Sequence, residues 1–265
     1  MYAPTGDAHA GSVRGHMSDD TLDGHKQRAA AHAVQFVQPG MVVGLGTGST
    51  AIHAVRGIAA LLAQGVLRDV VGFATSRATG QEAVRLGIPM LTEDMPSAID
   101  LTIDGADEID PAMNLIKGGG GALLREKIAA QASSRVVIVA DDSKLSDRLG
   151  TRFALPVEVL PFGWRSQARF LAALGATVSV RRTPDGADAH TDQGNLILDC
   201  AFGPIPDAAS LADRLSGRAG IVAHGLFLDL ADDAIIAGPT GIRHMRADRT
   251  TRVVARTDLD TDLAG

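Results

Sequence analysis

The stretch that decides the fold is Met41-Val-Val-Gly-Leu-Gly-Thr-Gly-Ser-Thr50. Its first half is apolar and predicts a short buried strand over 41–45. The segment that follows, Ala51–Ala63, is rich in Ala and Leu and predicts a helix. Glycines between the two allow a tight turn with positive φ. Strand, glycine turn and helix begin a βαβ unit, so this stretch favours an α/β fold.

The same alternation continues along the first 150 residues. Short apolar runs predict strands, the segments between them have helical spacing, and Pro39-Gly40 ends the first helix. Repeated βαβ units imply a Rossmann-like, mostly parallel sheet flanked by helices. The expected helices span 21–37, 51–63, 78–86 and 122–132, and the expected strands span 41–45, 70–74, 89–91, 100–103 and 135–140.

The pattern changes after about Thr151. The order becomes strand, helix, two strands, helix and strand, which is the ferredoxin-like order. We therefore expect a second, smaller α+β ferredoxin-like domain over 151–227. The Rossmann-like domain would comprise 21–150 plus 228–265, and 1–20 would be a disordered extension. The expected strands are 155–160, 176–182, 195–200 and 221–227, with helices at 166–174 and 208–215 and a returning strand at 233–237.

Composition disfavours several function classes. A net charge of −6 and an aromatic content of 3% argue against nucleic-acid binding. No apolar run is long enough to span a membrane, and residues 1–16 lack the core of a signal peptide. The single cysteine, Cys200, has no partner for an intrachain disulfide, which fits a cytoplasmic protein. The eight histidines show no metal-site spacing near the glycine-rich segments, so no metal is implied.

The first segment that could carry chemistry is Gly44-Leu-Gly-Thr-Gly-Ser-Thr50. A glycine loop at a helix N-terminus suits a phosphate, and three hydroxyl groups add donors. A tight turn with a Ser or Thr cap is the alternative. A dinucleotide fingerprint would need glycine at Ser49 and an acidic residue where Thr75-Ser76-Arg77 stands. Because Arg77 could bind a 2′-phosphate, an NADP site is weakened but not excluded. A Walker loop would need a Gly-Lys-Ser/Thr sequence, which is missing here.

The second segment is Ile103-Asp-Gly-Ala-Asp-Glu-Ile-Asp110. Asp104 and Asp107 follow an apolar strand, where ligands bind in open α/β sheets, and could bind hydroxyls or move protons. Gly105 and Ala106 break the pattern of a calcium loop. A solvated acidic turn remains the alternative, because Asp185-Gly-Ala-Asp188 repeats the tetrapeptide in a predicted surface turn.

The third segment is Lys117-Gly-Gly-Gly-Gly-Ala-Leu-Leu-Arg-Glu-Lys127. Glycines that lead into an apolar helix can form an anion-binding nest, to which Lys117 would add a cation. Glu126 lies about one turn inside the helix and could face the same crevice. The alternatives are a flexible linker for the glycines and a paired surface charge for Glu126.

Together, GLGTGST (44–50), DGADEID (104–110) and KGGGGALLREK (117–127) resemble the A-type ribose-5-phosphate isomerases in order and separation. The resemblance runs from about Thr21 to about Ile242 and includes Ser143-Lys144 and Leu155-Pro-Val-Glu-Val159. It implies a metal-free, cofactor-free enzyme that interconverts D-ribose 5-phosphate and D-ribulose 5-phosphate through an enediolate. It also suggests a homodimer or homotetramer, with the Rossmann-like domain as the catalytic one.

The resemblance also implies roles for single residues. Glu126 would be the base at C2, Asp104 and Asp107 would contact the sugar and assist proton movement, and Lys117 with the following glycines would stabilise negative charge. Burial would raise the pKa of Glu126 and Lys117 would lower it, so the sequence leaves the direction open. The implied substrate-binding residues are Thr47, Gly48, Ser49, Thr50, Gly105, Ala106, Gly118, Gly119, Gly120 and Lys144.

Two other functions stay open at this point. One is an isomerase or amino-sugar deaminase for another sugar phosphate on a related α/β fold. The other is a non-catalytic sugar-phosphate sensor, although the N-terminal region has no room for a DNA-binding helix-turn-helix before the first helix. The presence of glutamate, aspartate and lysine together favours catalysis, because binding alone needs no base.

Overall fold

The computed structural model describes residues 21–91 and 98–247. Its largest sheet has six strands in the order β13-β12-β6-β3-β1-β2, parallel except for β13, which runs antiparallel to β12. The expected extension over 1–20 and the end of the chain from 248 lie outside the described residues. The strands are β1 (Val42–Leu45), β2 (Val71–Ala74), β3 (Leu101–Asp104), β6 (Val136–Asp141), β12 (Asp233–Gly238) and β13 (Gly241–Arg246).

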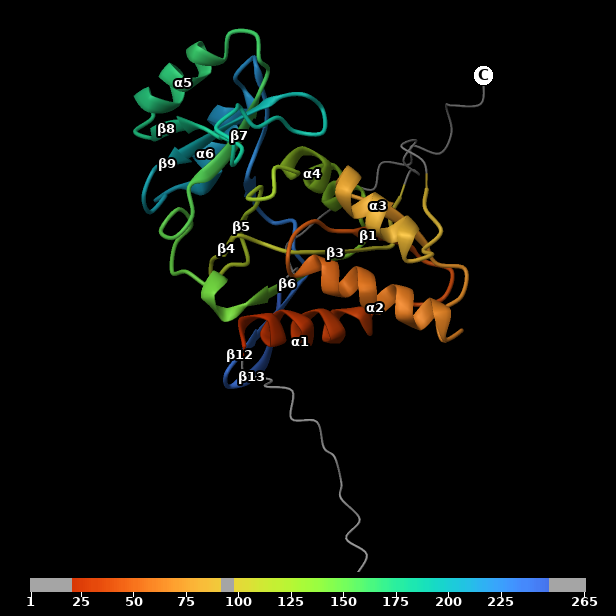
Figure 1. Ribbon diagram of the computed structural model, residues 1–265. Coiled ribbons are helices and arrows are strands. Elements are labelled where there is room, and N and C mark those ends of the chain that lie inside the picture. Colours follow the sequence, from red (N-terminus) through yellow and green to blue (C-terminus); the bar gives the residue numbers. More distant parts are fainter. Residues whose placement is uncertain (1–20, 92–97, 248–265) are drawn as a thin grey trace, which may run out of the picture.

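Helices cover both faces of this sheet, as the alternating sequence predicts. On one face, α1 (Leu22–Val34) packs beside α2 (Ala51–Ala63), and α3 (Arg77–Arg85) packs beside α2 near the β2 edge; α4 (Leu123–Ala132) lies on the other face (Figure 1). Every residue of β6 is buried, which explains its continuous apolar sequence. The expectation of a mostly parallel sheet flanked by helices is confirmed.

The strand order reverses between β1 and β3. The chain runs from β1 to β2 towards one edge and from β3 through β6 to β12 towards the other. In open α/β sheets, ligands bind beyond the carboxyl ends of the strands at such a reversal. The two loops that leave these strands, 46–50 and 105–107, therefore occupy the position where a ligand is expected.

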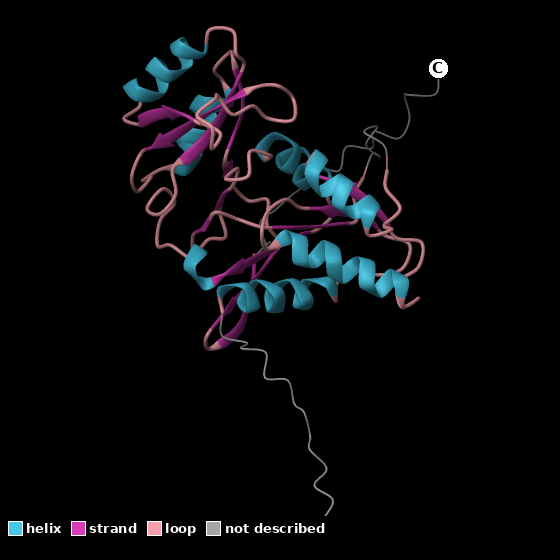
Figure 2. Ribbon diagram, in the orientation of Figure 1, coloured by secondary structure: helices cyan, strands magenta, loops and turns pink. Residues whose placement is uncertain are grey.

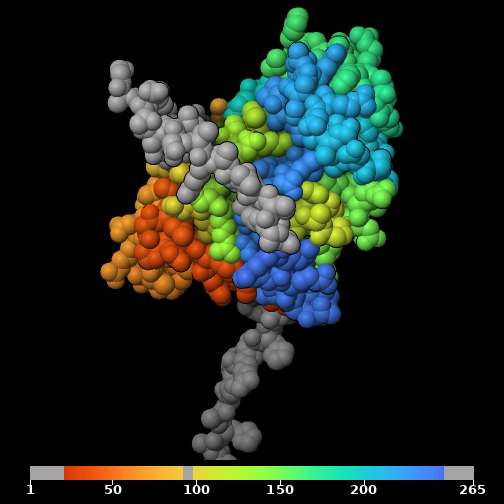
Figure 3. All heavy atoms as spheres, turned by 180° about the vertical axis from the view of Figure 1, so that it is seen from behind, coloured from red at the N-terminus to blue at the C-terminus, as the bar shows by residue number. Residues whose placement is uncertain are grey.

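A second sheet has the strand order β10-β7-β9-β8, all antiparallel, with α5 (Trp164–Ala173) and α6 (Ala208–Ser216) in the connections. This is the ferredoxin-like arrangement that the element order predicts. Figure 2 shows the unit beside the larger sheet, and Figure 3 shows it from behind in cyan and light blue. Its strands are β7 (Leu155–Val159), β8 (Thr177–Val180), β9 (Leu196–Ala201) and β10 (Ile221–His224).

Several details differ from the sequence expectations. The expected strand over 221–227 is two strands, because the chain turns at Gly225, and β11 (Leu226–Phe227) joins β5 (Leu115–Ile116) and β4 (Glu108–Ile109) in a small third sheet. The expected strand over 89–91 is wrong: only Met90 forms a single bridge, to Gly72. β13 was not expected, since its residues alternate little in polarity. No helix in the described ranges is long and apolar enough to cross a membrane.

Candidate active site

The loop after β1 is held directly against the end of β3. A Cβ atom on Gly46 would lie 2.3 Å from Oδ1 of Asp104, so only glycine allows this approach. Oδ1 of Asp104 accepts hydrogen bonds from the backbone N–H groups of Thr47 (3.1 Å) and Gly105 (2.7 Å). The carboxylate of Asp104 thus joins the two loops at the point where the strand order reverses.

Lys117 follows β5 and reaches the same place from the other side. Its ammonium nitrogen lies 3.1 Å from Oδ2 of Asp104 and 3.2 Å from Oε1 of Glu126, and it donates to the carbonyl oxygen of Gly105 at 2.5 Å. All three charged side chains are almost completely buried. Burial lowers the pKa of Lys117, but the charges of Asp104 and Glu126 outweigh it, and the pKa lies above its usual value.

Glu126 stands in the first turn of α4, and 4% of the residue is exposed. Burial raises the pKa of its carboxyl group to about 8; the ammonium group of Lys117 opposes the shift, and the charge of Asp104 adds to it. Burial likewise raises the pKa of Asp104. Among the described residues, Oε2 of Glu126 has no hydrogen-bond partner. A carboxylate with one oxygen fixed by a lysine and the other unengaged is suited to accept a proton.

The glycines after Lys117 form a nest held by two side chains. The N–H of Gly119 donates to Oδ2 of Asp107 at 2.7 Å. From the ferredoxin-like unit, the guanidinium group of Arg181 donates to the carbonyl oxygens of Gly118 (2.7 Å) and Gly119 (3.0 Å) and also pairs with the carboxylate of Asp199. The glycine loop is therefore held at one N–H group and two carbonyl oxygens.

The acidic residues of segment 104–110 have two different roles, one in the cleft and one in holding neighbouring loops. Asp104 and Asp107 hold the lysine and the glycine nest. Glu108 is fully buried and accepts hydrogen bonds from four consecutive backbone N–H groups, at 150–153. Asp110 accepts from the backbone N–H and the side-chain amide of Asn114. The reading as a solvated acidic turn is wrong for the buried Asp104 and Glu108.

Hydroxyl groups and a second lysine surround the loop after β1. The hydroxyl group of Thr47 lies 2.8 Å from that of Thr75 and 2.9 Å from that of Ser76. Lys26, on α1, donates from Nζ to the hydroxyl group of Ser49 at 3.0 Å. Lys26 was not among the predicted site residues, because nothing in a helix of ordinary composition indicates which loop it approaches. Arg181 was not predicted either, because its contact depends on how the ferredoxin-like unit docks.

One narrow cleft of about 80 Å³ lies between the loop after β1, the acidic segment and the glycine loop. Lys144, on the short 3-10 helix η1 (Asp142–Lys144), lies on its wall. Of the expected site residues only Asp104 is not on the wall, since its two carboxylate oxygens are engaged behind the cleft. The lining residues are Thr47, Gly48, Ser49, Thr50, Gly105, Ala106, Asp107, Lys117, Gly118, Gly119, Gly120, Glu126 and Lys144.

Residues 71–241 match the sequence model of the family described as ribose 5-phosphate isomerase A (phosphoriboisomerase A). This match covers more than half of the chain and includes two of the three glycine- and aspartate-containing segments.

The chain belongs to the ribose-5-phosphate isomerase A family.

Relatives in this family are similar over most of their length. The ribose-5-phosphate isomerase A of Chloroflexus aurantiacus is 59% identical over 229 residues, which cover 86% of this chain and 96% of the relative. That of Desulfatibacillum aliphaticivorans is 53% identical over 225 residues, covering 85% and 98%. The loops of the cleft lie in a chain that matches these proteins almost from end to end.

Solved structures of ribose 5-phosphate isomerases have the same fold. The enzyme of Plasmodium falciparum superimposes with a TM-score of 0.83 at 40% identity, over 86% of this chain and all of the other. A D-ribose-5-phosphate isomerase in complex with phospho-erythronic acid gives a TM-score of 0.83 at 34% identity, over 85% and 99%. The neighbours thus share both the large sheet and the ferredoxin-like unit.

Proposed function

We propose that this chain interconverts D-ribose 5-phosphate and D-ribulose 5-phosphate, with Glu126 as the base. One observation carries the proposal: Glu126 presents an unengaged carboxylate oxygen beside Lys117 in the cleft where the strand order reverses. The family relationship supports the same activity. A pKa of about 8 makes the ionised carboxylate a stronger base than an ordinary glutamate.

The reaction moves a carbonyl group from C1 to C2. The carboxylate of Glu126 removes the proton on C2; the released electron pair forms a C1–C2 double bond, and the C1 carbonyl oxygen takes the charge and then a proton. Loss of the proton on the C2 hydroxyl re-forms a carbonyl at C2, and Glu126 returns its proton to C1. One carboxylate serves both carbons because they are adjacent on one face of the enediolate.

The negative charge on the enediolate oxygens contributes most to the activation free energy of this reaction, and fixed hydrogen-bond donors lower that free energy. In our proposal Lys117 supplies a cation that stays protonated, and the N–H groups of Gly118 and Gly120 act as donors in a loop that Asp107 and Arg181 hold in place through Gly118 and Gly119. Asp107 would also move the proton between the two oxygens. Asp104 would act by positioning Lys117 and the loop at 46–50.

The phosphate group would bind at the loop after β1. Gly48, Ser49 and Thr50 precede α2, whose N-terminus carries unpaired N–H groups and a partial positive charge. Lys26 adds an ammonium group at Ser49, and Lys144, which also lines the cleft, adds a second. Gly105 and Ala106 form the floor beneath the sugar in this arrangement.

The test is the conversion of ribose 5-phosphate by wild type and Glu126→Gln after treatment with EDTA. We expect turnover in the wild type and at least about a hundredfold loss of kcat in the variant. Substrate deuterated at C2 should react more slowly with the wild type, because the C2–H bond breaks. Glu82→Gln, a change to a glutamate on α3 outside the cleft, is the matched control.

Each outcome bears on a different part of the proposal. Full activity in folded Glu126→Gln would remove Glu126 as the base. Activity on other pentose or hexose phosphates, but not on ribose 5-phosphate, would favour an isomerase or deaminase of different specificity. Binding of the sugar phosphate without turnover in the wild type would favour the sensor.

We also propose that the chain assembles as a homodimer or homotetramer in the cytoplasm. The family resemblance supports the assembly, and Leu160 and Phe162, both exposed before α5, offer apolar side chains for a contact between subunits. The buried, free thiol of Cys200 fits a reducing compartment. Light scattering after size-exclusion chromatography tests the assembly, and a monomeric mass would contradict it.

The division into 21–150 plus 228–265 and 151–227 remains a prediction. Its support is that the ferredoxin-like unit has its own apolar core around Leu155, Leu171 and Leu198. Limited proteolysis should cut near 150 and 228 before it cuts within either unit.

A further inference from the structure

A second cavity, larger than the catalytic cleft, lies between α3 and the start of α4. Its volume is about 490 Å³, which falls within the range of pockets that bind small molecules. It is lined by α3, the end of β2, Met90, Leu91 and Arg125. It shares no lining residue with the catalytic cleft. None of the residues that line this cavity has a role in the reaction proposed above.

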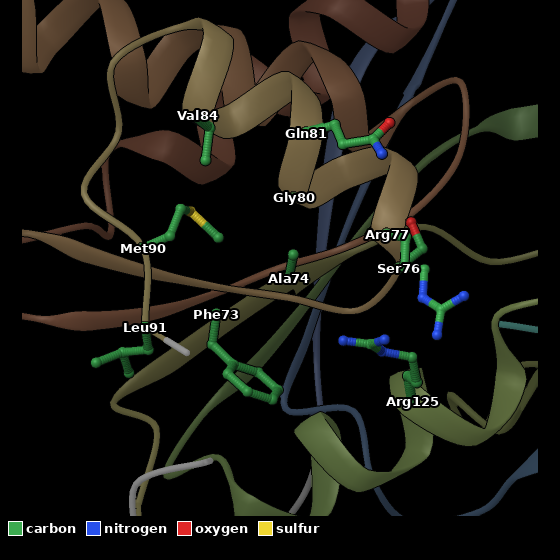
Figure 4. A pocket seen from close by; sticks show the side chains of 10 residues that line it. All are labelled: Phe73, Ala74, Ser76, Arg77, Gly80, Gln81, Val84, Met90, Leu91 and Arg125. Carbon is green, nitrogen blue, oxygen red and sulfur yellow. The ribbon is translucent and has the colours of Figure 1, made fainter. Parts of the chain in front are cut away.

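The two ends of the cavity differ in chemistry. Figure 4 shows Val84, Met90 and Leu91 at one end and the guanidinium groups of Arg77 and Arg125 near each other at the opposite end. Phe73 presents its ring between them. Val84 is 64% exposed although it is apolar, so a ligand at that end would remove apolar surface from water.

Of the two arginines, Arg77 gives the stronger indication that an anion binds here. Among the described residues its guanidinium group forms no hydrogen bond or ion pair; its backbone N–H donates to Oδ2 of Asp192 at 2.8 Å. It is also the first residue of α3, where the helix dipole disfavours a cation. The carboxylate of Asp192 also lies 3.9 Å from a guanidinium nitrogen of Arg125, so two guanidinium groups and one carboxylate leave a net positive charge at this end. An anion bound there would form direct hydrogen bonds with Arg77.

We propose that this cavity is an accessory binding site for an aromatic organic anion. A phosphate or sulfonate group would lie between Arg77 and Arg125, whose planar guanidinium groups bind such oxygens in pairs. A flat apolar ring would lie against Phe73, Met90 and Leu91. A sugar phosphate alone fits poorly, because it has no apolar part for the second end.

The site is separate from the catalytic cleft but adjacent to it. Arg125 immediately precedes Glu126 on α4, and the hydroxyl group of Ser76, next to Arg77, bonds to that of Thr47. Because their linings are separate, both sites can be filled at once. Substrate in the cleft should leave the affinity of the accessory site within about threefold, because no lining residue is shared.

The probe is 1-naphthyl phosphate, titrated by calorimetry into the full chain with and without saturating ribose 5-phosphate. 1-Naphthol, which lacks the anion, and inorganic phosphate, which lacks the ring, are run beside it. We expect 1-naphthyl phosphate to bind at least tenfold more tightly than either fragment, with ribose 5-phosphate present or not. Arg77→Ala should weaken binding about tenfold, as loss of a charge-assisted hydrogen bond does.

Two further variants make the test specific. Val84→Asp places a carboxylate at the exposed apolar end and should weaken binding without unfolding the helix. Arg85→Ala removes a guanidinium group of the same helix that pairs with Glu82 and does not line the cavity, so its affinity should equal that of the wild type.

Three results would overturn the proposal. The first is that 1-naphthyl phosphate does not bind to the wild type at millimolar concentration. The second is that ribose 5-phosphate displaces the probe. The third is that both Arg77→Ala and Val84→Asp bind the probe with unchanged affinity.

Discussion

The ammonium nitrogen of Lys117 lies 3.2 Å from Oε1 of Glu126, and both side chains are almost completely buried. An isolated ion pair of this kind lowers the pKa of the carboxyl group. Here burial and the neighbouring charge of Asp104 outweigh the lysine, and the pKa of Glu126 rises to about 8.

The first prediction concerns the pH dependence of catalysis. Glu126 accepts a proton only when ionised, and below its pKa the ionised fraction grows tenfold per pH unit. The logarithm of kcat/KM should therefore rise with pH and level off near pH 8. It should not fall again by pH 9, because the pKa of Lys117 lies above its usual value. A profile that is flat from pH 6.5 to 9 would contradict the assignment.

The second prediction concerns stability. The pKa of Glu126 is higher in the folded protein than the ordinary value of 4.5, so between these two pH values the folded state binds more protons than the unfolded state. The contribution of Glu126 to stability therefore falls as pH rises from about 4.5 to 8. Glu126→Gln should raise Tm at pH 9 by a few degrees and leave it nearly unchanged at pH 4.5. Calorimetry at both pH values measures the difference; a variant less stable than wild type at pH 9 would contradict it.

The third prediction concerns the approach of the two loops. Gly46→Ala would place a methyl group 2.3 Å from Oδ1 of Asp104 and 2.5 Å from its Cα. Since Asp104 holds Lys117, we expect at least about a hundredfold loss of kcat and a destabilisation of about 2 kcal/mol or more. Gly105→Ala serves as the stability control, because its methyl group would meet no atom closer than 3.9 Å. Equal Tm values for the two variants would refute the argument.

The fourth prediction concerns Arg181. Arg181→Ala releases the carbonyl oxygens of Gly118 and Gly119, so kcat should fall at least about tenfold while KM changes little. Added guanidinium at millimolar concentration should restore part of the rate. Arg182→Ala, which removes a neighbouring exposed guanidinium paired with Asp188, should keep wild-type kinetics. An equal loss of kcat in both variants would indicate general damage to the ferredoxin-like unit.

The fifth prediction concerns Lys26. If its ammonium group binds the phosphate at Ser49, Lys26→Met should raise KM about tenfold and leave kcat within about twofold. Inhibition by inorganic phosphate should weaken in the same proportion, and Lys26→Arg should recover most of the affinity. A change in kcat alone would place Lys26 outside the phosphate site.

Much of the fold could be predicted because its signals are local. The helix at Ala51–Ala63 has the predicted bounds, since its composition and the glycine turn before it define both ends. The sequence predicted a ligand-binding loop after each of two strands, and loops 46–50 and 105–107 lie together because those strands, β1 and β3, are parallel neighbours. In contrast, β4 and β5 have two residues each, which is too short for any periodic pattern.

Other features depend on packing that sequence does not reveal. Arg181 contacts Gly118 across 63 residues, and only the docking of the ferredoxin-like unit decides that contact. The direction of the pKa shift of Glu126 depends on how burial balances against Lys117, which requires both the exposed fraction and the distances.

The position of β12 affects the order in which the chain can fold during synthesis. β12 pairs with β6, but the whole ferredoxin-like unit separates the two strands in the chain. While the ribosome adds residues 142–232, β6 is an apolar, unpaired edge, the kind of surface at which nascent chains associate wrongly. The inserted unit forms mostly local antiparallel pairs and can fold in that interval. Ribosome stalling within the insertion, or early termination there, should therefore yield an aggregation-prone product, whereas a chain that extends past Gly238 closes that side of β6.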